Sequence, residues 1–222
     1  MRLELYNCGI MRCCARVLPL LLLLVSSSFA ASKPHVTAFG PWRVVKPVGT
    51  DESSLRIRPL FVDSRQKEYT TGPVHEVTDR LFVVRRVYRM NDSLPEESDK
   101  PARWTWQPGG WISVDRLTGH IAQLNLTGWD PAVSEASWYR DYVAYCGTSN
   151  DGSKAYMLVS ELGRRKPVLR REFSGSTCPA PRWERNPSRV TFAPAQGEKV
   201  TFVVQGRSVD LQENSAPEEA SQ

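Results

Sequence analysis

Residues 138–173, WYRDYVAYCGTSNDGSKAYMLVSELGRRKPVLRREF, carry the strongest structural signal in this chain. Residues 139–146 and 155–162 alternate as strands do, and residues 168–173 form a third run of this kind. Between the first two runs, Asn150-Asp151-Gly152 is a strong signal for a tight turn. These residues predict an antiparallel meander of three strands, around which we expect the rest of the chain to be organised.

Most of the remaining chain also shows short runs typical of strands, at residues 36–40, 42–48, 55–62, 74–77, 80–90, 111–115, 120–126, 189–193 and 199–205. The run at 80–90 is apolar on both faces, which predicts a central strand, with a bulge or an exit from the core at Arg85 and Arg86. No segment after the first thirty residues shows the spacing of an amphipathic helix. We therefore predict an all-β fold, a compact antiparallel sandwich or partly open barrel with very little helix.

Turns and loops are predicted where polar residues, Gly and Pro gather. Residues 91–103 predict a loop, and Gln107-Pro108-Gly109-Gly110 predicts a turn. The short run at residues 132–137 predicts one helical turn. Residues 32–210 are thus expected to form a single all-β domain, followed by a disordered tail at residues 211–222.

The first thirty residues predict a secretory signal peptide rather than a part of the fold. Arg12 and Arg16 precede an apolar run at residues 17–25, and Ser28-Phe29-Ala30 supplies the small residues of a cleavage site. The alternative is a membrane anchor, but this run is much shorter than the roughly 20 residues that cross a bilayer. We expect a secreted or periplasmic protein with no transmembrane segment after signal cleavage.

Removal of residues 1–30 changes the charge and the cysteine content of the chain. Loss of three arginines and one glutamate lowers the formal net charge from +5 to +3, too mild an excess to predict a nucleic-acid partner. Of the cysteines, Cys146 and Cys178 remain, and in an oxidising compartment they predict one disulfide. The alternative is two separately buried thiols, whereas a metal site is disfavoured because neither has a second ligand at the usual spacing.

Two segments resemble parts of β-propeller proteins. SWYRDYVAYCGTSNDGSKAYMLVSELGRRKPVLRRE, residues 137–172, resembles one blade of the TolB-type and WD-type propellers, and ISVDRLTGHIAQLNL, residues 112–126, is similar to a hairpin of quinoprotein-type blades. Residues 32–103 contain no second copy, so the resemblance implies one blade-like meander inside a compact all-β domain and not a whole propeller. The chain as a whole is similar to small exported bacterial proteins of unknown function.

Residues that would support catalysis or metal binding are scattered. His35, His75 and His120 show no ligand spacing, so we expect no metal and no cofactor. Asp115 and His120 would supply two members of a hydrolytic triad, but they flank a turn, where an aspartate is commonly a cap and a histidine an exposed ring. A secreted hydrolase with an unplaced active site is therefore the alternative hypothesis.

Aromatic residues are the better candidates for a binding site. Trp104, Trp106, Trp111 and Trp129 are the predicted ligand-binding residues, because exposed rings stack on sugars or partner surfaces. The alternative is that they fill the core. Trp104 and Trp106 lie two residues apart beside the predicted loop, so we expect both to lie exposed on one face of a strand.

Basic residues at 164–166 and 170–171 would attract acidic polymers, but their places in a turn and on opposite faces of a strand favour solvated side chains. The sequence therefore predicts an exported soluble binding or interaction module. Its partner would be an envelope or extracellular protein or glycan, not nucleic acid.

Overall fold

The structure, a computed structural model, describes residues 33–47, 54–97, 101–175, 178–206 and 208–212. The predicted signal peptide and residues 213–222 of the predicted tail lie outside the described residues. The predicted all-β fold is confirmed, since the described elements are antiparallel strands apart from one 3-10 turn, η1 (Pro95–Glu97). Among these residues there is no helix with the length and apolar character needed to span a membrane.

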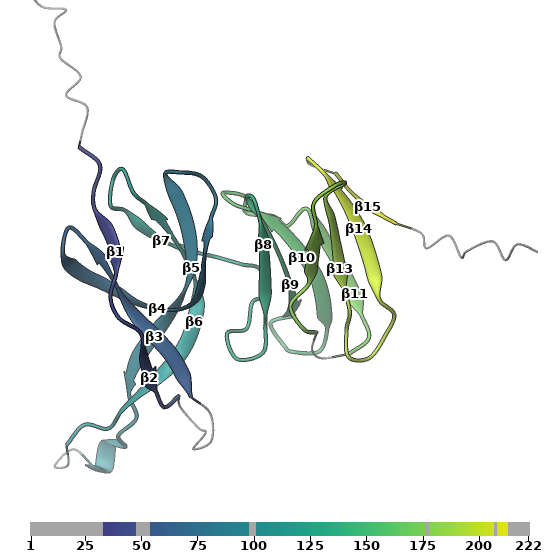
Figure 1. Cartoon of the computed structure of the whole chain (residues 1–222). Coiled ribbons are helices and arrows are strands. Elements are labelled where there is room, and N and C mark those ends of the chain that lie inside the picture. The colour runs from purple at the N-terminus through teal and green to yellow at the C-terminus, as the bar shows by residue number, and fades with distance from the viewer. Residues whose placement is uncertain (1–32, 48–53, 98–100, 176–177, 207, 213–222) are drawn as a thin grey trace, which may run out of the picture. The chain divides into compact units, whose positions relative to one another are not determined.

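Seven strands form the first sheet in the order β1-β3-β4-β5-β6-β7, with β2 also paired to β3 (Figure 1). The strands are β1 (Thr37–Phe39), β2 (Arg43–Val45), β3 (Leu55–Val62), β4 (Arg65–Glu76), β5 (Leu81–Asn91), β6 (Trp104–Asp115) and β7 (Ile121–Leu124). The prediction for β3 is correct at both ends. β5 is central, as its two apolar faces predicted.

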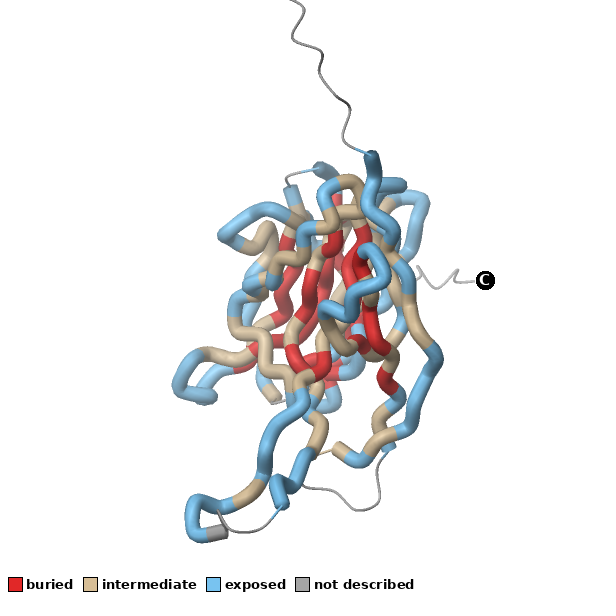
Figure 2. Tube along the Cα trace, turned by 90° about the vertical axis from the view of Figure 1, so that its left-hand side faces the viewer, coloured by how far each residue is buried: buried red, intermediate tan, exposed pale blue. Residues whose placement is uncertain are grey.

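The first sheet curls around one of its own faces. Leu60, Phe82, Val84, Ile112 and Val114 form a buried cluster there. Figure 2 shows the buried stretches of the chain in red. The chain after β2 forms a parallel bridge from Pro47 to Trp106 of β6. Within the described residues the hydrogen-bond ladder does not close into a barrel, so the sheet is partly open.

The remaining strands form two four-stranded antiparallel sheets. One contains β8 (Ala136–Tyr139), β9 (Tyr142–Thr148), β10 (Ala155–Glu161) and β11 (Leu169–Phe173), and the other contains β12 (Arg182–Glu184), β13 (Arg189–Phe192), β14 (Val200–Gln205) and β15 (Ser208–Leu211). A shared buried cluster of residues from both sheets packs between them, Ala144, Cys146, Met157, Val159, Cys178, Val190, Phe192, Phe202 and Val204. The two sheets are therefore the halves of a β-sandwich.

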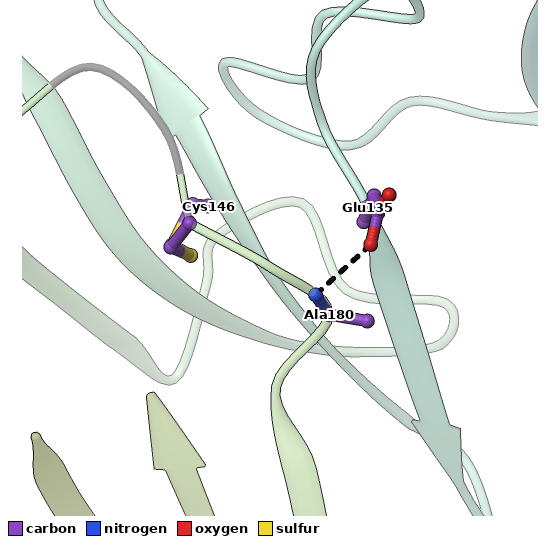
Figure 3. The surroundings of a disulfide bond; sticks show 4 residues. Glu135, Cys146 and Ala180 are labelled. Carbon is purple, nitrogen blue, oxygen red and sulfur yellow. Dashed lines mark hydrogen bonds between the residues drawn. A yellow bond between two sulfur atoms is a disulfide. The ribbon is translucent and has the colours of Figure 1, made fainter. Parts of the chain in front are cut away.

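A disulfide joins Cys146 of β9 to Cys178, which precedes β12, so the predicted pairing is confirmed. Their Cα atoms lie 6.0 Å apart, and both side chains are buried in the sandwich core. Close to the bridge, the backbone N–H of Ala180 donates a hydrogen bond of 3.1 Å to Glu135 (Figure 3). The covalent bond and this hydrogen bond hold the segment that leads into β12 against the sheet of β8–β11.

We predict that replacing both Cys146 and Cys178 with Ala lowers the free energy of unfolding by about 3–4 kcal/mol, because the unfolded chain regains the freedom of a loop of roughly 33 residues. Denaturant unfolding measures this loss. A reductant should lower the stability of the wild-type protein to the same level and leave the double variant unchanged. Equal stability of the oxidised protein and the variant would contradict the prediction.

The meander has four strands instead of the predicted three, because residues 139–146 are not one continuous strand. The run is divided between β8 and β9 by a turn at Arg140 and Asp141, and Arg140 has a φ of 53°. A non-glycine residue with positive φ is uncommon, so Arg140 gave no signal for this turn, although Asp141 is of a type that turns favour. The polar residues 65–71 were likewise not predicted as strand, although they form the first half of β4. The predicted helical turn at residues 132–137 is also wrong, because β8 begins at Ala136.

The predicted turn at residues 107–110 is wrong, because these residues lie inside β6 and form a bulge opposite Arg86 of β5. Gly109 allows the ring of Tyr88 to lie on the backbone, since a Cβ atom at Gly109 would lie 2.4 Å from Tyr88 Cε2. The same Pro and Gly residues that usually mark a turn therefore permit an irregular strand here.

We predict that Gly109→Ala destabilises the protein by about 1–3 kcal/mol, because the added methyl group overpacks against Tyr88. Gly110→Ala is the matched control, since a Cβ atom there meets nothing within 4 Å. Its free energy of unfolding should stay within about 1 kcal/mol of the wild type. Thermal or denaturant unfolding of the two variants distinguishes the sites, and equal effects would refute the role of Tyr88.

Candidate functional site

The bulge in β6 places Trp104, Trp106 and Trp111 on one face of the first sheet. Trp104 lies opposite Asn91, Trp106 opposite Arg89 and Trp111 opposite Arg85, all odd-numbered positions of β5. Alternate residues of a strand share a face, so Trp106 and Trp111, five residues apart, would lie on opposite faces of a regular strand. The extra residue of the bulge puts them on the same face. We refer to Trp104, Trp106 and Trp111 as the aromatic stripe.

One end of the aromatic stripe is exposed. Half of the Trp104 surface is accessible to solvent, and the guanidinium carbon of Arg89 lies 4.6 Å from its ring centroid. Trp106 is half-buried and meets Tyr69 edge to face at 4.7 Å between ring centroids. Exposure therefore decreases from Trp104 to Trp106.

The other end of the stripe is buried in an aromatic cluster. Trp111 is only 7% exposed, and its ring meets those of Trp138 and Trp129 edge to face, at 5.3 Å and 6.4 Å between ring centroids. His75 stacks on Trp138 at 5.7 Å. The indole Nε1 atoms of Trp111, Trp129 and Trp138 are buried and have no hydrogen-bond acceptor among the described residues.

Arg85 also links the first sheet to the segment that follows it. Its guanidinium donates hydrogen bonds to the backbone oxygens of Gly109 at 3.2 Å and Pro131 at 2.5 Å, and lies 5.7 Å from the Trp129 ring centroid. Burial lowers the pKa of Arg85 from its usual value, but the group stays charged because that value is so high. Its role in the structure is to fix residue 131 against the sheet.

Among the four sequence-predicted binding residues, Trp104 is exposed as expected and Trp106 is only partly so. Trp111 and Trp129 pack into the cluster, which is the core role that the sequence left open for them. Trp138 belongs to the same cluster and was not among the four predicted binding residues. No spacing rule indicates that it would meet Trp111, because 26 residues lie between them in the chain.

The hydrolytic arrangement suggested by Asp115 and His120 is not assembled. The Asp115 carboxylate accepts two hydrogen bonds of 2.9 Å from Arg80 Nε and two from the backbone N–H groups of Leu117 and Thr118. The Arg80 contact holds the pKa of Asp115 well below its usual range. No hydrogen bond joins the Asp115 and His120 side chains, so Asp115 serves as a turn cap.

The other histidines are also placed apart. His35 pairs with Asp63, and His75 Nε2 lies 2.7 Å from the backbone oxygen of Arg140. The part of the chain that the structure describes contains no group of three or more His, Cys, Asp or Glu residues able to hold a metal ion.

A cleft of about 490 Å³ opens where the chain leaves β7 and passes the turn between β10 and β11. One wall consists of residues 123–127 and the other of residues 160–165, with Trp138 and Val143 completing the lining. Sequence analysis did not predict this cleft. Its walls lie more than thirty residues apart in the chain, and the individual residues resemble those of ordinary turns.

In comparisons with known proteins, no family model and no curated protein matches this chain. The blade-like resemblance therefore stays a prediction. β8–β11 is a four-stranded antiparallel meander, which is the topology of a blade, and β12–β15 repeats that topology. The function must accordingly be argued from surfaces and clefts.

Tyr145 supports one wall of the cleft between residues 123–127 and 160–165. Its buried phenol also makes the stability of the fold depend on pH. Its side chain is fully buried, its hydroxyl donates a hydrogen bond of 2.9 Å to the backbone oxygen of Thr127, and burial raises its pKa to about 12. The neutral phenol therefore stabilises the fold fully below the unfolded pKa of about 10, and this contribution is lost as the pH rises through about 12.

We predict that Tyr145→Phe, which keeps the ring but cannot ionise, loses less stability than the wild type between pH 10 and 12. Denaturant unfolding at several alkaline pH values measures the difference. Absorbance titration at about 295 nm should also lose its most alkaline tyrosine step. Identical alkaline profiles for the two proteins would show that Tyr145 is not buried as a neutral phenol.

Proposed function

We propose that this protein is an exported binding module of the cell envelope or extracellular space, and that its ligand contacts the exposed end of the aromatic stripe at Trp104. The observation that carries the proposal is the contrast along one strand. Trp111 is enclosed by other rings, whereas Trp104 on the same face keeps half of its surface open to solvent. Large exposed rings are costly to leave in water and are enriched at binding sites.

A charged side chain lies beside the exposed ring. Arg89 covers part of the Trp104 ring and forms no ion pair with another described residue. A ring beside a cation suits ligands that present both apolar and polar faces, such as sugars or a protein surface.

Export is supported by the sequence of residues 1–30 and by the buried disulfide. Disulfides persist in oxidising compartments and are uncommon in the cytosol. The bond between Cys146 and Cys178 links the two halves of the sandwich.

We predict that Trp104→Ala weakens ligand binding by about 2 kcal/mol, or roughly 30-fold, because a hot-spot ring is lost. Its free energy of unfolding should change by less than about 0.5 kcal/mol, since the site is exposed. Glycan-array binding of the wild type and the variant, followed by titration of each positive glycan, measures the first effect. Thermal unfolding measures the second.

Trp111→Ala is the matched control, because the same change at the buried end should cost about 3–5 kcal/mol of stability. Single substitutions are preferable to a Trp104 and Trp106 double variant, in which loss of the Tyr69 contact would confuse the two effects. Undiminished binding by Trp104→Ala to every glycan bound by the wild type, or a stability loss as large as that of Trp111→Ala, would refute the proposal.

A further inference from the structure

The cleft between residues 123–127 and 160–165 has walls fixed by the backbone. Thr148 N–H donates a hydrogen bond of 2.8 Å to Gly128, directly after the first wall, and Leu162 N–H donates one of 2.7 Å to Asp141. The Tyr145 hydroxyl holds Thr127 from below. Such walls need little rearrangement to receive a ligand, which reduces the entropic cost of binding.

The cleft carries one excess positive charge. Arg164 forms an ion pair of 2.7 Å with Glu161, so these two lining charges compensate one another. Arg165 also lines the cleft, is exposed, and forms no ion pair or hydrogen bond with another described residue. A guanidinium without a partner is suited to a planar carboxylate, which it contacts through two parallel hydrogen bonds.

The rest of the lining offers both polar groups and apolar surface. Gln123, Asn125 and Thr127 are exposed and supply amide and hydroxyl groups, whereas Leu126, Leu162 and Trp138 supply apolar surface. This combination suits a sugar ring, whose hydroxyl groups need hydrogen-bond partners and whose C–H face packs on apolar side chains. The cleft volume also lies within the roughly 300–1,000 Å³ typical of small-ligand sites.

We propose that this cleft binds a carboxylate-bearing sugar, a uronate residue of an acidic polysaccharide, with Arg165 contacting the carboxylate. A single unpaired cation favours a monoanion over a polyphosphate, which would require several cations or a cluster of backbone N–H groups. The cleft shares no residue with the exposed end of the aromatic stripe. The proposal therefore stands independently of the function proposed for Trp104.

The test titrates the folded, disulfide-bonded protein with glucuronate, galacturonate and their short oligomers, using calorimetry and ligand-observed NMR. Glucose and galactose serve as neutral comparators. The wild type should bind the acidic sugars more tightly than the neutral ones, and added salt should weaken only the acidic sugars. Arg165→Gln should reduce affinity for the acidic sugars at least about tenfold and leave the neutral sugars unaffected.

Lys166→Gln is the matched control, because it removes the same charge from the same turn at a residue that does not line the cleft. The affinity of this variant for the acidic sugars should stay within about twofold of the wild type, since an exposed charge that does not contact the ligand contributes little to binding. Equal losses in the two variants, equal affinity for acidic and neutral sugars, or no binding of acidic sugars would each overturn the proposal. Trp104→Ala should bind the acidic sugars as the wild type does, and a loss in that variant would also count against a separate site.

Discussion

The packing of Trp111 between Trp129 and Trp138 is the interaction on which the arrangement of the described chain depends. It joins the partly open first sheet to the segment that leads into the sandwich, and His75 and Arg85 add contacts at the same place. Each aromatic pair contributes about 0.5–1.5 kcal/mol beyond the burial of its surface. The position of Trp111 depends in turn on the bulge at Gly109, since a regular strand would turn the ring to the opposite face.

A second constraint operates within the sandwich. The sheet of β8–β11 is buried on both faces, because Val143, Tyr145 and Leu158 pack under the segment carrying Trp129, whereas the opposite face packs on β13 and β14. Strands buried on both faces must lack polar positions, which explains the continuous apolar run in β9. The disulfide lies on the sandwich side of this sheet, so the covalent bond and the aromatic cluster secure its two faces separately.

The sequence predicted those parts of the structure that depend on local pattern. Strands such as β3 and β5, the disulfide and the turn at Asp151 follow from alternation, cysteine count and turn residues. The errors occurred where tertiary contacts override local preference. Arg140 adopts a positive φ in a turn, the polar first half of β4 is held by pairing with β3 and β5, and Gly109 permits a bulge because Tyr88 packs on it. The cleft was unpredictable because Arg165 and Thr127 become neighbours only through the packing of β7 beside the β10–β11 turn.

Taken together, these constraints leave the aromatic residues in two environments, one enclosed and one open, on a single strand. Hydrogen exchange of the indole N–H groups, followed by NMR with each resonance assigned by a Trp→Phe variant, tests this division most directly. The account predicts strong protection for Trp111, Trp129 and Trp138, whose Nε1 atoms are buried, and exchange at nearly the rate of free tryptophan for Trp104. Protection of Trp104 equal to that of Trp111, or rapid exchange of all four groups, would contradict it.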